Sequence, residues 1–345
     1  MIIPVNKKPY CLHYEKSYPF KLFDTYSDEK AISDRMVELN SLKAQEGYFF
    51  FFDKRTKVTP VGWAVSEDND VLEASVLYYW ENCDSLESLR IPSYEICNNI
   101  NRIESGKKFD IAYSFNLRYA SNNYWHFYND LIGQLIKLRE WIDKNITILI
   151  PDYLRNSKAF DFFRRTDFGK TLNFYFQGNE IVECDKLILI RNSINTKLNW
   201  EFIDTNANSI LELEKTPMNI FVGRSHSTRR HIKNIDEVKK VLTKNGFKYV
   251  EFDDESIEKQ ISYFKNAKNI IGIHGASLAN LAFCRSECKM LEVHTDIDFP
   301  PHYYWLSKQK GIYYNAIIGF GKDTNQNFFV DVNKLESKIK AMLEV

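Results

Sequence analysis

The stretch Ile270–Phe283, with the sequence IIGIHGASLANLAF, decides the fold. It predicts a short buried strand, a tight turn through His274 and Gly275, and a helix that opens at Ala276 and Ser277. Where a strand leads through small residues into a helix, backbone N–H groups lie free at the positive end of the helix dipole. Phosphate and other anions bind at such helix starts, so we predict an anionic ligand at this turn.

Strand-like and helix-like patterns alternate on both sides of this stretch. Strands are predicted at 219–222, 248–252, 270–273, 289–293 and 312–317, and helices at 235–245, 256–266, 276–283, 301–309 and 332–343. Alternation of this kind is typical of a parallel sheet with helices on both faces. Ligands of such sheets bind beyond the carboxyl ends of the strands.

Charged residues follow the predicted strands. Arg224, Arg229 and Arg230 come after 219–222, and their guanidinium groups can grip a phosphate bidentately while staying charged. Together with the helix start at 275–278 they would offset the charge of a diphosphate, including one that leaves in a displacement reaction. Glu292 lies on the strand 289–293, where a nucleotide site of an α/β protein can use an acid for a ribose hydroxyl.

The first half of the chain is less regular. Strands are predicted at 49–52, 111–115, 146–150, 172–176, 181–184 and 186–190, and helices at 125–141 and 153–163. The polar, Asn-rich residues 192–217 indicate an interdomain boundary. We therefore predict an N-terminal domain at 1–195, a linker at 196–217 and a C-terminal domain at 218–325. The helix within 326–345 is expected to pack back on the N-terminal domain.

The predicted helix at 125–141 carries His126 and Asp130 on one face, because side chains four residues apart lie one above the other. A histidine that is oriented by an acid can serve as general base for a sugar hydroxyl. Polar pairs at this spacing are also common on helix surfaces without any catalytic role, and the spacing alone favours that simpler interpretation.

The composition predicts a globular protein. Apolar residues make up 44% and charged residues 27% of the chain, and 46 basic residues balance 46 acidic ones, so no general binding of nucleic acid is expected. None of the six cysteines forms a Cys-x-x-Cys pair, and Asp296 and Asp298 supply too few oxygens for a hard cation, so no metal site is predicted. The sequence contains neither a Walker motif nor Gly-x-Gly-x-x-Gly.

The N-terminal residues lack the apolar core of a signal peptide, and no apolar run approaches the length of about 20 residues that spans a bilayer. We therefore expect a reduced, cytoplasmic protein. A peripheral contact with the inner membrane stays open, through Phe49–Phe52 or the Lys-rich C-terminal helix, although the phenylalanine run is expected to be a buried strand.

Several of these segments resemble glycosyltransferase family 61. The family's Asn-x-x-His segment, with an acid about a turn later, is similar to Asn123–His126 followed by Asp130. Its arginine-rich segment is similar to Arg224 and to the run Arg230–Asn234.

The resemblance continues towards the C-terminus and covers roughly residues 110–320. The family's His-Gly-Ala turn, with a Gln before it, is similar to His274–Asn280 with Gln260, and its Val-Ile-Glu-Ile strand is similar to Leu291–Val293. Two positions depart from the family pattern: Ile235 stands where the family usually has Glu, and Ser277 where it usually has Gly.

The resemblance implies a GT-B fold, in which two Rossmann-like domains face an interdomain cleft. It implies inverting transfer of a sugar from a nucleotide sugar, usually a UDP-sugar, without an obligatory metal or other cofactor. The C-terminal domain would hold the donor, and the N-terminal domain, with its variable residues 1–110, would bind an oligosaccharide or lipid-linked glycan acceptor.

The implied residue roles follow this division. His126 or Asp130 would remove the proton of the acceptor, whereas His274 is expected to order its turn or touch phosphate. The donor site would comprise Arg224, Arg229, Arg230, Asn234, His274, Gly275, Ala276, Ser277, Leu278, Asn280 and Glu292.

Two other functions stay open from the sequence. The chain could be a non-catalytic glycan-binding or scaffold protein that kept the fold, or an enzyme that moves a sugar phosphate onto a polymer, as capsule polymerases do. Composition and resemblance together favour bacterial capsule or lipopolysaccharide synthesis. The sequence leaves open the sugar (hexosyl or pentosyl), the acceptor, the linkage and the oligomeric state.

Overall fold

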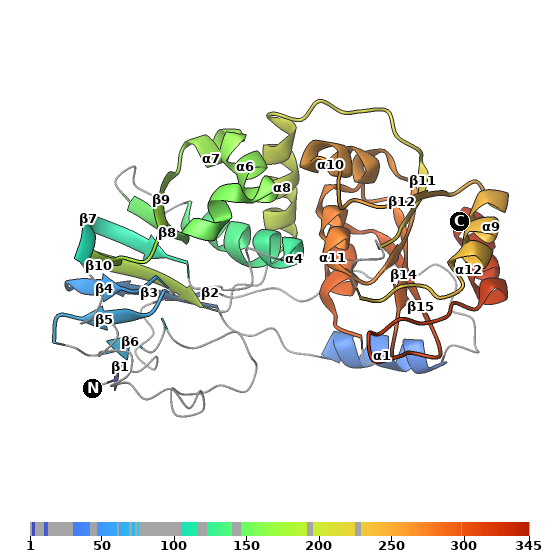
Figure 1. Ribbon diagram of the computed structural model, residues 1–345, viewed down its shortest axis with the longest axis horizontal. Coiled ribbons are helices and arrows are strands. Elements are labelled where there is room, and N and C mark those ends of the chain that lie inside the picture. The colour runs from blue at the N-terminus through green and yellow to red at the C-terminus, as the bar shows by residue number, and fades with distance from the viewer. Residues whose placement is uncertain are drawn as a thin grey trace. The chain divides into compact units, whose positions relative to one another are not determined.

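A computed structural model of the chain describes residues 2–3, 10–12, 30–41, 47–60, 62–68, 71–72, 75, 105–115, 123–139, 146–191, 196–224, 229–297 and 299–344 (Figure 1). The chain divides into two compact units, of which the first comprises residues 1–15 and 44–195 and the second comprises 16–43 and 196–345. Each unit has its own sheet with helices, which confirms the predicted α/β class.

The second unit is built on a parallel sheet of order β12-β11-β13-β14-β15. Its strands are β11 (Asn219–Val222), β12 (Lys248–Val250), β13 (Asn269–Ile273), β14 (Lys289–His294) and β15 (Tyr313–Ile318), as predicted within one or two residues at most ends. Because β12 and β13 flank β11 on opposite sides, the strand order reverses at the β11–β13 pair. Open α/β sheets bind their ligands at this kind of switch point, beyond the carboxyl ends of the strands.

Helices cover both faces of this sheet (Figure 1). The elements are α9 (Ile235–Lys244) and α12 (Val332–Glu344) on one face, and α10 (Ile257–Asn266) and α11 (His302–Lys310) on the other. Ser256 caps the start of α10, since its hydroxyl accepts a hydrogen bond from the N–H of Lys259 at 3.1 Å. Gly246 ends α9 with a φ of 76°, a conformation that glycine adopts without strain.

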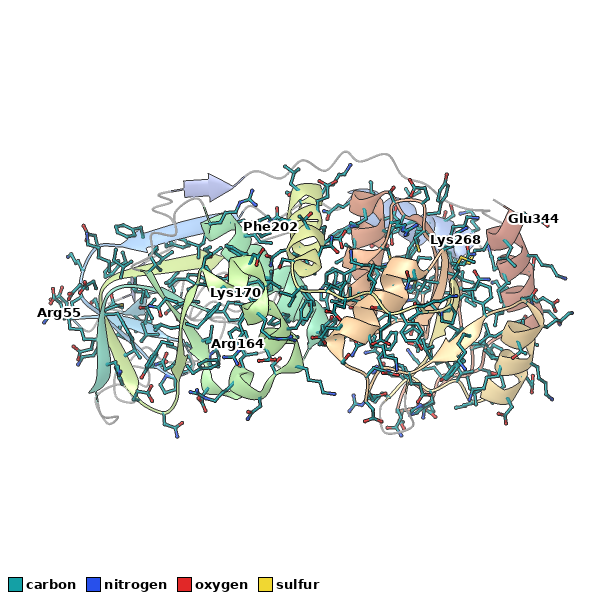
Figure 2. All side chains as sticks on the ribbon, turned by 90° about the horizontal axis from the view of Figure 1, so that it is seen from above. Arg55, Arg164, Lys170, Phe202, Lys268 and Glu344 are labelled. Carbon is teal, nitrogen blue, oxygen red and sulfur yellow. The ribbon has the colours of Figure 1, made fainter. Side chains whose placement is uncertain are left out.

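The C-terminal helix differs from its prediction. We expected it on the N-terminal domain, but α12 packs on the sheet of the second unit, where Leu335, Ile339 and Met342 are fully buried in one core with Phe221 of β11. The Lys289 ammonium also donates to the backbone oxygen of Met342 at 2.7 Å. Lys268, directly before β13, and Glu344, the last residue of α12, are labelled in Figure 2. The apolar face of α12 thus covers a sheet face within its own unit.

Two segments that we predicted outside the C-terminal domain belong to the second unit. The expected linker at 196–217 contains α8 (Lys197–Asn208), because Trp200, Ile203 and Ala207 form an apolar stripe within a polar sequence. The helix α1 (Lys30–Ser41) comes from the N-terminal part of the chain, yet Arg35 Nη2 donates to the backbone oxygen of Phe299 at 2.9 Å.

The first unit has a mixed sheet, with β10 (Ile181–Arg191) at its centre. β10 pairs in parallel with β7 (Ser105–Ser114), which is followed by β8 (Ile146–Pro151) and β9 (Asn173–Gln177), also parallel. On its other side β10 pairs antiparallel with β3 (Gly47–Phe52) and β4 (Thr56–Val58). The sheet is completed by β1 (Ile2–Ile3), β2 (Tyr10–Leu12), β5 (Ala64–Ser66) and β6 (Val71–Leu72).

Several details of this unit differ from the sequence predictions. The strands expected at 181–184 and 186–190 form one strand, β10, and the helix expected at 153–163 is divided into η3 (Asp152–Asn156) and α6 (Lys158–Arg165), after which α7 (Asp167–Lys170) follows. The phenylalanine run is a strand, as predicted, with Phe50 and Phe52 against the core and Phe51 46% exposed. No described helix combines the length and apolar character needed to cross a membrane.

Candidate functional site

Arg224 and Arg230 converge on the turn that follows β13. Arg230 Nη1 donates to the backbone oxygen of His274 at 2.6 Å, and Arg224 Nη1 donates to the same oxygen at 3.4 Å. Because Arg224 comes shortly after β11 and His274 directly follows β13, both arginines lie at the switch point of the sheet. The structure thus brings together the arginines and the His-Gly-Ala turn that the sequence analysis assigned to one anion site.

The two guanidinium groups are held in an environment that favours a bound anion. Burial lowers the pKa of both Arg224 and Arg230, and the charge of Arg230 lowers the pKa of Arg224 further. These shifts mean that each cation is poorly solvated and repelled by the other. A phosphate oxygen placed between them would relieve both effects through charge-assisted hydrogen bonds.

Arg230 is fixed in a strained backbone conformation. Its φ of 70° is in the left-handed region, which for a residue other than glycine costs about 1–3 kcal/mol and is concentrated at functional sites. The surrounding loop is tied to the segment before α12, since the N–H of Arg230 donates to Asn325 at 3.3 Å and the N–H of His231 donates to Asn327 Oδ1 at 2.9 Å. Arg230 Nε is buried without an acceptor within the described part of the chain.

Gly275 allows Arg224 to lie directly against the turn. A Cβ atom on Gly275 would lie 2.1 Å from Arg224 Nη1, whereas a Cβ on Gly272 would lie 2.5 Å from Leu278 Cδ2. The helix predicted after the turn is a 3₁₀ helix, η4 (Ala276–Phe283), rather than an α-helix. The N–H of Leu278 donates to the backbone oxygen of Gly275 at 3.0 Å. Of the N–H groups at 275–278 that we predicted to bind an anion, this one is therefore bonded within the turn.

Beneath the turn lies a buried carboxylate with histidine partners. His274 Nδ1 is 2.6 Å from Glu292 Oε1, the Tyr314 hydroxyl donates to Glu292 Oε2 at 2.7 Å, and His294 Nε2 lies 3.4 Å from the same oxygen. Burial alone would raise the pKa of Glu292, but the charges and hydrogen bonds of His294 and His274 lower it well below its usual range. Glu292 is therefore held as a carboxylate, whereas burial lowers the pKa of its neighbour His294.

This burial disfavours the ribose contact that we predicted for Glu292. Its side chain is 1% exposed, and protein groups already bond to both of its oxygens. A ribose hydroxyl would have to displace one of them. The physical reason for the difference is that Glu292 lies within β14, an inner strand, between Gly272 of β13 and Ala316 of β15, where protein groups and not solvent surround it.

The same three residues have the composition of a metal site. Ligand atoms of His274, Glu292 and His294 lie within 4.8 Å of one another, the only such group in the part of the chain that the structure describes. However, His274 Nδ1 and Glu292 Oε1 are at direct hydrogen-bond distance, 2.6 Å. In a tetrahedral site, where each ligand atom lies about 2.0–2.2 Å from the metal ion, two ligand atoms lie further from each other than these two do. We therefore interpret the group as a hydrogen-bonded network. Asp296 pairs with Lys322, and Asp298 lies outside the described residues.

Three other predicted donor-site residues have different positions. Both ends of the Asn234 amide bond to the backbone of Val330, at 2.9 and 3.0 Å, and Asn280 is fully buried with its Nδ2 on the oxygen of Ser277 at 3.0 Å. These amides fix loops of the site and are not free to bind a ligand. Arg229 is exposed, and its charge lowers the pKa of its neighbour Arg230.

The first unit holds a His–Asp dyad on the helical segment that follows β7 in the chain. Asn123 begins the helix, since its Oδ1 accepts from the N–H of Trp125 at 3.0 Å. His126 Nδ1 is 2.5 Å from Asp130 Oδ2, and Asn129 donates to Asp130 Oδ1 at 2.8 Å. Asp130 is 1% exposed and His126 22%, so the acid is buried and the imidazole reaches solvent. The acid of this pair is therefore buried, whereas the spacing alone favoured a pair on the helix surface.

The helix around this dyad has two features that sequence analysis missed. Between α4 (Tyr124–His126) and α5 (Gly133–Leu138) lies a π-helical segment, η2 (Phe127–Ile132), and such segments frequently mark functional sites. Lys137 follows on α5, where burial lowers its pKa to about 7 although the charge of Asp130 raises it. No sequence motif predicts the π-helical segment or the burial of Lys137, because both depend on how the helix packs. The end of the predicted helix, at 140–141, lies outside the described residues.

The fold and these groups define an α/β protein with two partly buried arginines at the switch point of a parallel sheet and a histidine–carboxylate dyad in a second α/β unit. Residues 124–291 match the family model described as Glycosyltransferase 61. The match contains His126, Arg224, Arg230 and His274, ends directly before Glu292, and supports a glycosyltransferase of family 61. No curated protein matches the chain.

Proposed function

We propose that the protein is an inverting glycosyltransferase of the GT-B type, which moves a sugar from a nucleotide sugar to a glycan acceptor. The observation that carries the proposal is the pair Arg224 and Arg230 on the oxygen of His274, at the switch point of the second sheet. Glycosyltransferase activity is supported by the family match. UDP as the nucleotide, metal independence and a role in bacterial surface polysaccharide synthesis belong to the proposal.

The second unit would bind the donor. The partly buried guanidinium groups of Arg224 and Arg230, and the N–H groups of Ala276 and Ser277 at the start of η4, would offer positive charge to a diphosphate. That charge is most valuable when the bond from the anomeric carbon to the diphosphate breaks, because the leaving group then gains negative charge. The strain at Arg230 supports this role, since preorganised donors need no rearrangement during the reaction.

The first unit would bind the acceptor and supply the base. With Nδ1 of His126 bonded to Asp130, the imidazole can take the proton of an acceptor hydroxyl at Nε2. The buried Asp130 then stabilises the imidazolium. The acceptor oxygen attacks the anomeric carbon from the face opposite the diphosphate, so the configuration inverts. An oligosaccharide or lipid-linked glycan is the proposed acceptor.

A panel of nucleotide sugars, screened by thermal shift, would identify the donor, since a ligand that binds the folded protein raises its melting temperature. Transfer to glycan acceptors is then compared among the wild type, His126→Ala, Asp130→Asn and Arg230→Ala. Arg164→Ala is a matched control, because Arg164 forms an exposed ion pair with Asp161 on α6. Figure 2 labels Arg164.

We expect the dyad variants to lose about 10²–10⁴-fold in transfer rate while they still bind the donor. Arg230→Ala should lose donor affinity, and Arg164→Ala should behave as the wild type. Full transfer activity in Arg230→Ala would refute the diphosphate assignment, and full activity in both dyad variants would refute the base. A wild type that binds no nucleotide sugar would favour a scaffold, and a phosphodiester product would show a sugar-phosphate transferase.

A further inference from the structure

His274 has a second ring nitrogen that the structure leaves available at the anion site. Nδ1 bonds to Glu292, and the backbone oxygen of His274 accepts from both Arg224 and Arg230. No hydrogen bond within the described part of the chain involves Nε2. The side chain is 15% exposed, so the imidazole is accessible from the same turn on which both arginines converge.

The network beneath His274 holds its ring in one orientation. Glu292 is an anionic carboxylate that is 1% exposed and is fixed from its other side by the Tyr314 hydroxyl at 2.7 Å. A buried anion at hydrogen-bond distance from Nδ1 orients the imidazole and would balance the charge of an imidazolium formed during the reaction, as Asp130 would for His126. Within the part of the chain that the structure describes, each unit thus contains a histidine that is hydrogen-bonded through Nδ1 to a buried carboxylate.

Charged and titratable groups surround His274. The groups that face it are Glu292 and His294 on β14, Tyr314 on β15, His302 and Tyr303 on α11, and Arg224 and Arg230. The two arginines are positive and Glu292 is negative. A bound diphosphate would offset the arginine charges, so the balance shifts towards the imidazolium when the anionic ligand arrives.

We propose that His274 is the general acid of the reaction, which donates a proton from Nε2 to the leaving diphosphate, with Glu292 as its positioning residue. The proposal rests on the proposed glycosyltransferase function. As the bond between the anomeric carbon and the diphosphate oxygen breaks, that oxygen keeps the electron pair and takes the proton of His274. The acceptor oxygen forms the new bond to the anomeric carbon and gives its proton to His126. Exchange of one proton with water at each histidine restores both dyads.

The binding test uses inorganic pyrophosphate and UDP as probes, titrated calorimetrically at neutral pH in two buffers of different ionisation enthalpy. The wild type should take up protons on binding, and His274→Gln should bind both probes but take up fewer protons. His302→Gln is the matched control, since this ring lies next to His274, with centroids 6.3 Å apart. Equal proton uptake in wild type and His274→Gln, or loss of uptake in His302→Gln alone, would overturn the assignment.

The kinetic test uses the pH dependence of turnover. An acid must be protonated and a base deprotonated, so the wild type should give a bell-shaped profile of kcat. His274→Gln should lose the alkaline limb and about 10²-fold in kcat, with KM for the donor little changed. Glu292→Gln removes the anion and should move the alkaline limb to lower pH, and it tests the same claim if His274→Gln folds poorly. An alkaline limb unchanged in the folded variants would refute the proposal.

These outcomes separate the inference from the proposed function. If His274 is not the acid, the wild type still binds UDP and transfers the sugar, and only the proton uptake and the alkaline limb fail to respond. If the proposed function is wrong, neither UDP nor any nucleotide sugar binds or is turned over by the wild type.

Discussion

Substituting Gly275 with alanine would move one arginine while leaving the fold in place. The added Cβ would lie 2.1 Å from Arg224 Nη1 and 3.3 Å from its Cζ, so the guanidinium must leave the turn. The backbone need not change, because Gly275 has an extended conformation, φ 174° and ψ 167°, which alanine also adopts. The clash involves the far end of a flexible side chain and not the backbone.

The two effects of this substitution differ in size. Stability should change by at most about 1 kcal/mol, since alanine restricts the unfolded chain by about 0.4–1 kcal/mol and Arg224 can rotate away. Affinity for a diphosphate should fall by the value of a hydrogen bond to a charged group, about 1.5–3 kcal/mol. That loss corresponds to a dissociation constant about 10–150-fold higher. Loss of binding without loss of stability is the expected signature.

The assay is a calorimetric titration of inorganic pyrophosphate, combined with urea unfolding of the same preparations. Gly178→Ala is the matched control, because its Cβ would also displace a flexible side chain, with Glu180 Oε2 at 2.9 Å, in the other unit. The control should bind pyrophosphate as the wild type does. A Gly275→Ala protein that binds with wild-type affinity would refute the role of Arg224 at this turn.

Three further predictions concern strain, a loop clamp and a buried lysine. Arg230→Gly should be about 1 kcal/mol more stable to urea than Arg230→Ala, because only glycine relieves the left-handed conformation, while both lose pyrophosphate binding equally; equal stabilities would refute the strain. Asn234→Ala should lose about 1–3 kcal/mol in urea unfolding, because its bonds to Val330 disappear, yet lose less affinity than Arg230→Ala; the reverse order would restore Asn234 as a ligand residue. For Lys137 the folded pKa is about 7 and the ordinary value 10.5, so between these values the unfolded chain binds more protons and stability rises with pH. Lys137→Met should flatten that rise in urea unfolding measured across this pH window, and an unchanged slope would contradict the burial of a neutral lysine.

The parallel sheet and its site could be predicted because local sequence determines both. An apolar run rich in β-branched residues, such as 270–273, forms a strand whichever strand it pairs with. Residues directly after parallel strands meet at the same edge of the sheet. Arg224 and His274 therefore came together as expected. Capping residues such as Ser256 and Gly246 also act locally, each on the end of its own helix.

What could not be predicted depends on packing between distant segments. The stripe of Trp200 and Ile203 is hidden in a polar sequence, and nothing in α12 states which sheet face it will cover. The roles of Asn234 and Glu292 changed for the same reason: an amide or acid in a motif can bind a ligand or the protein itself, and only its burial decides. The strained φ of Arg230 is likewise imposed by the loop before α12.

The central claim is that Arg224 and Arg230 hold a diphosphate at the turn after β13. Titration of UDP and uridine into the wild type and into the double variant Arg224→Ala, Arg230→Ala tests it most directly. We predict that the wild type binds UDP far more tightly than uridine, and that the double variant loses this preference while it unfolds in the same urea range. Equal UDP affinity in the two proteins would contradict the account.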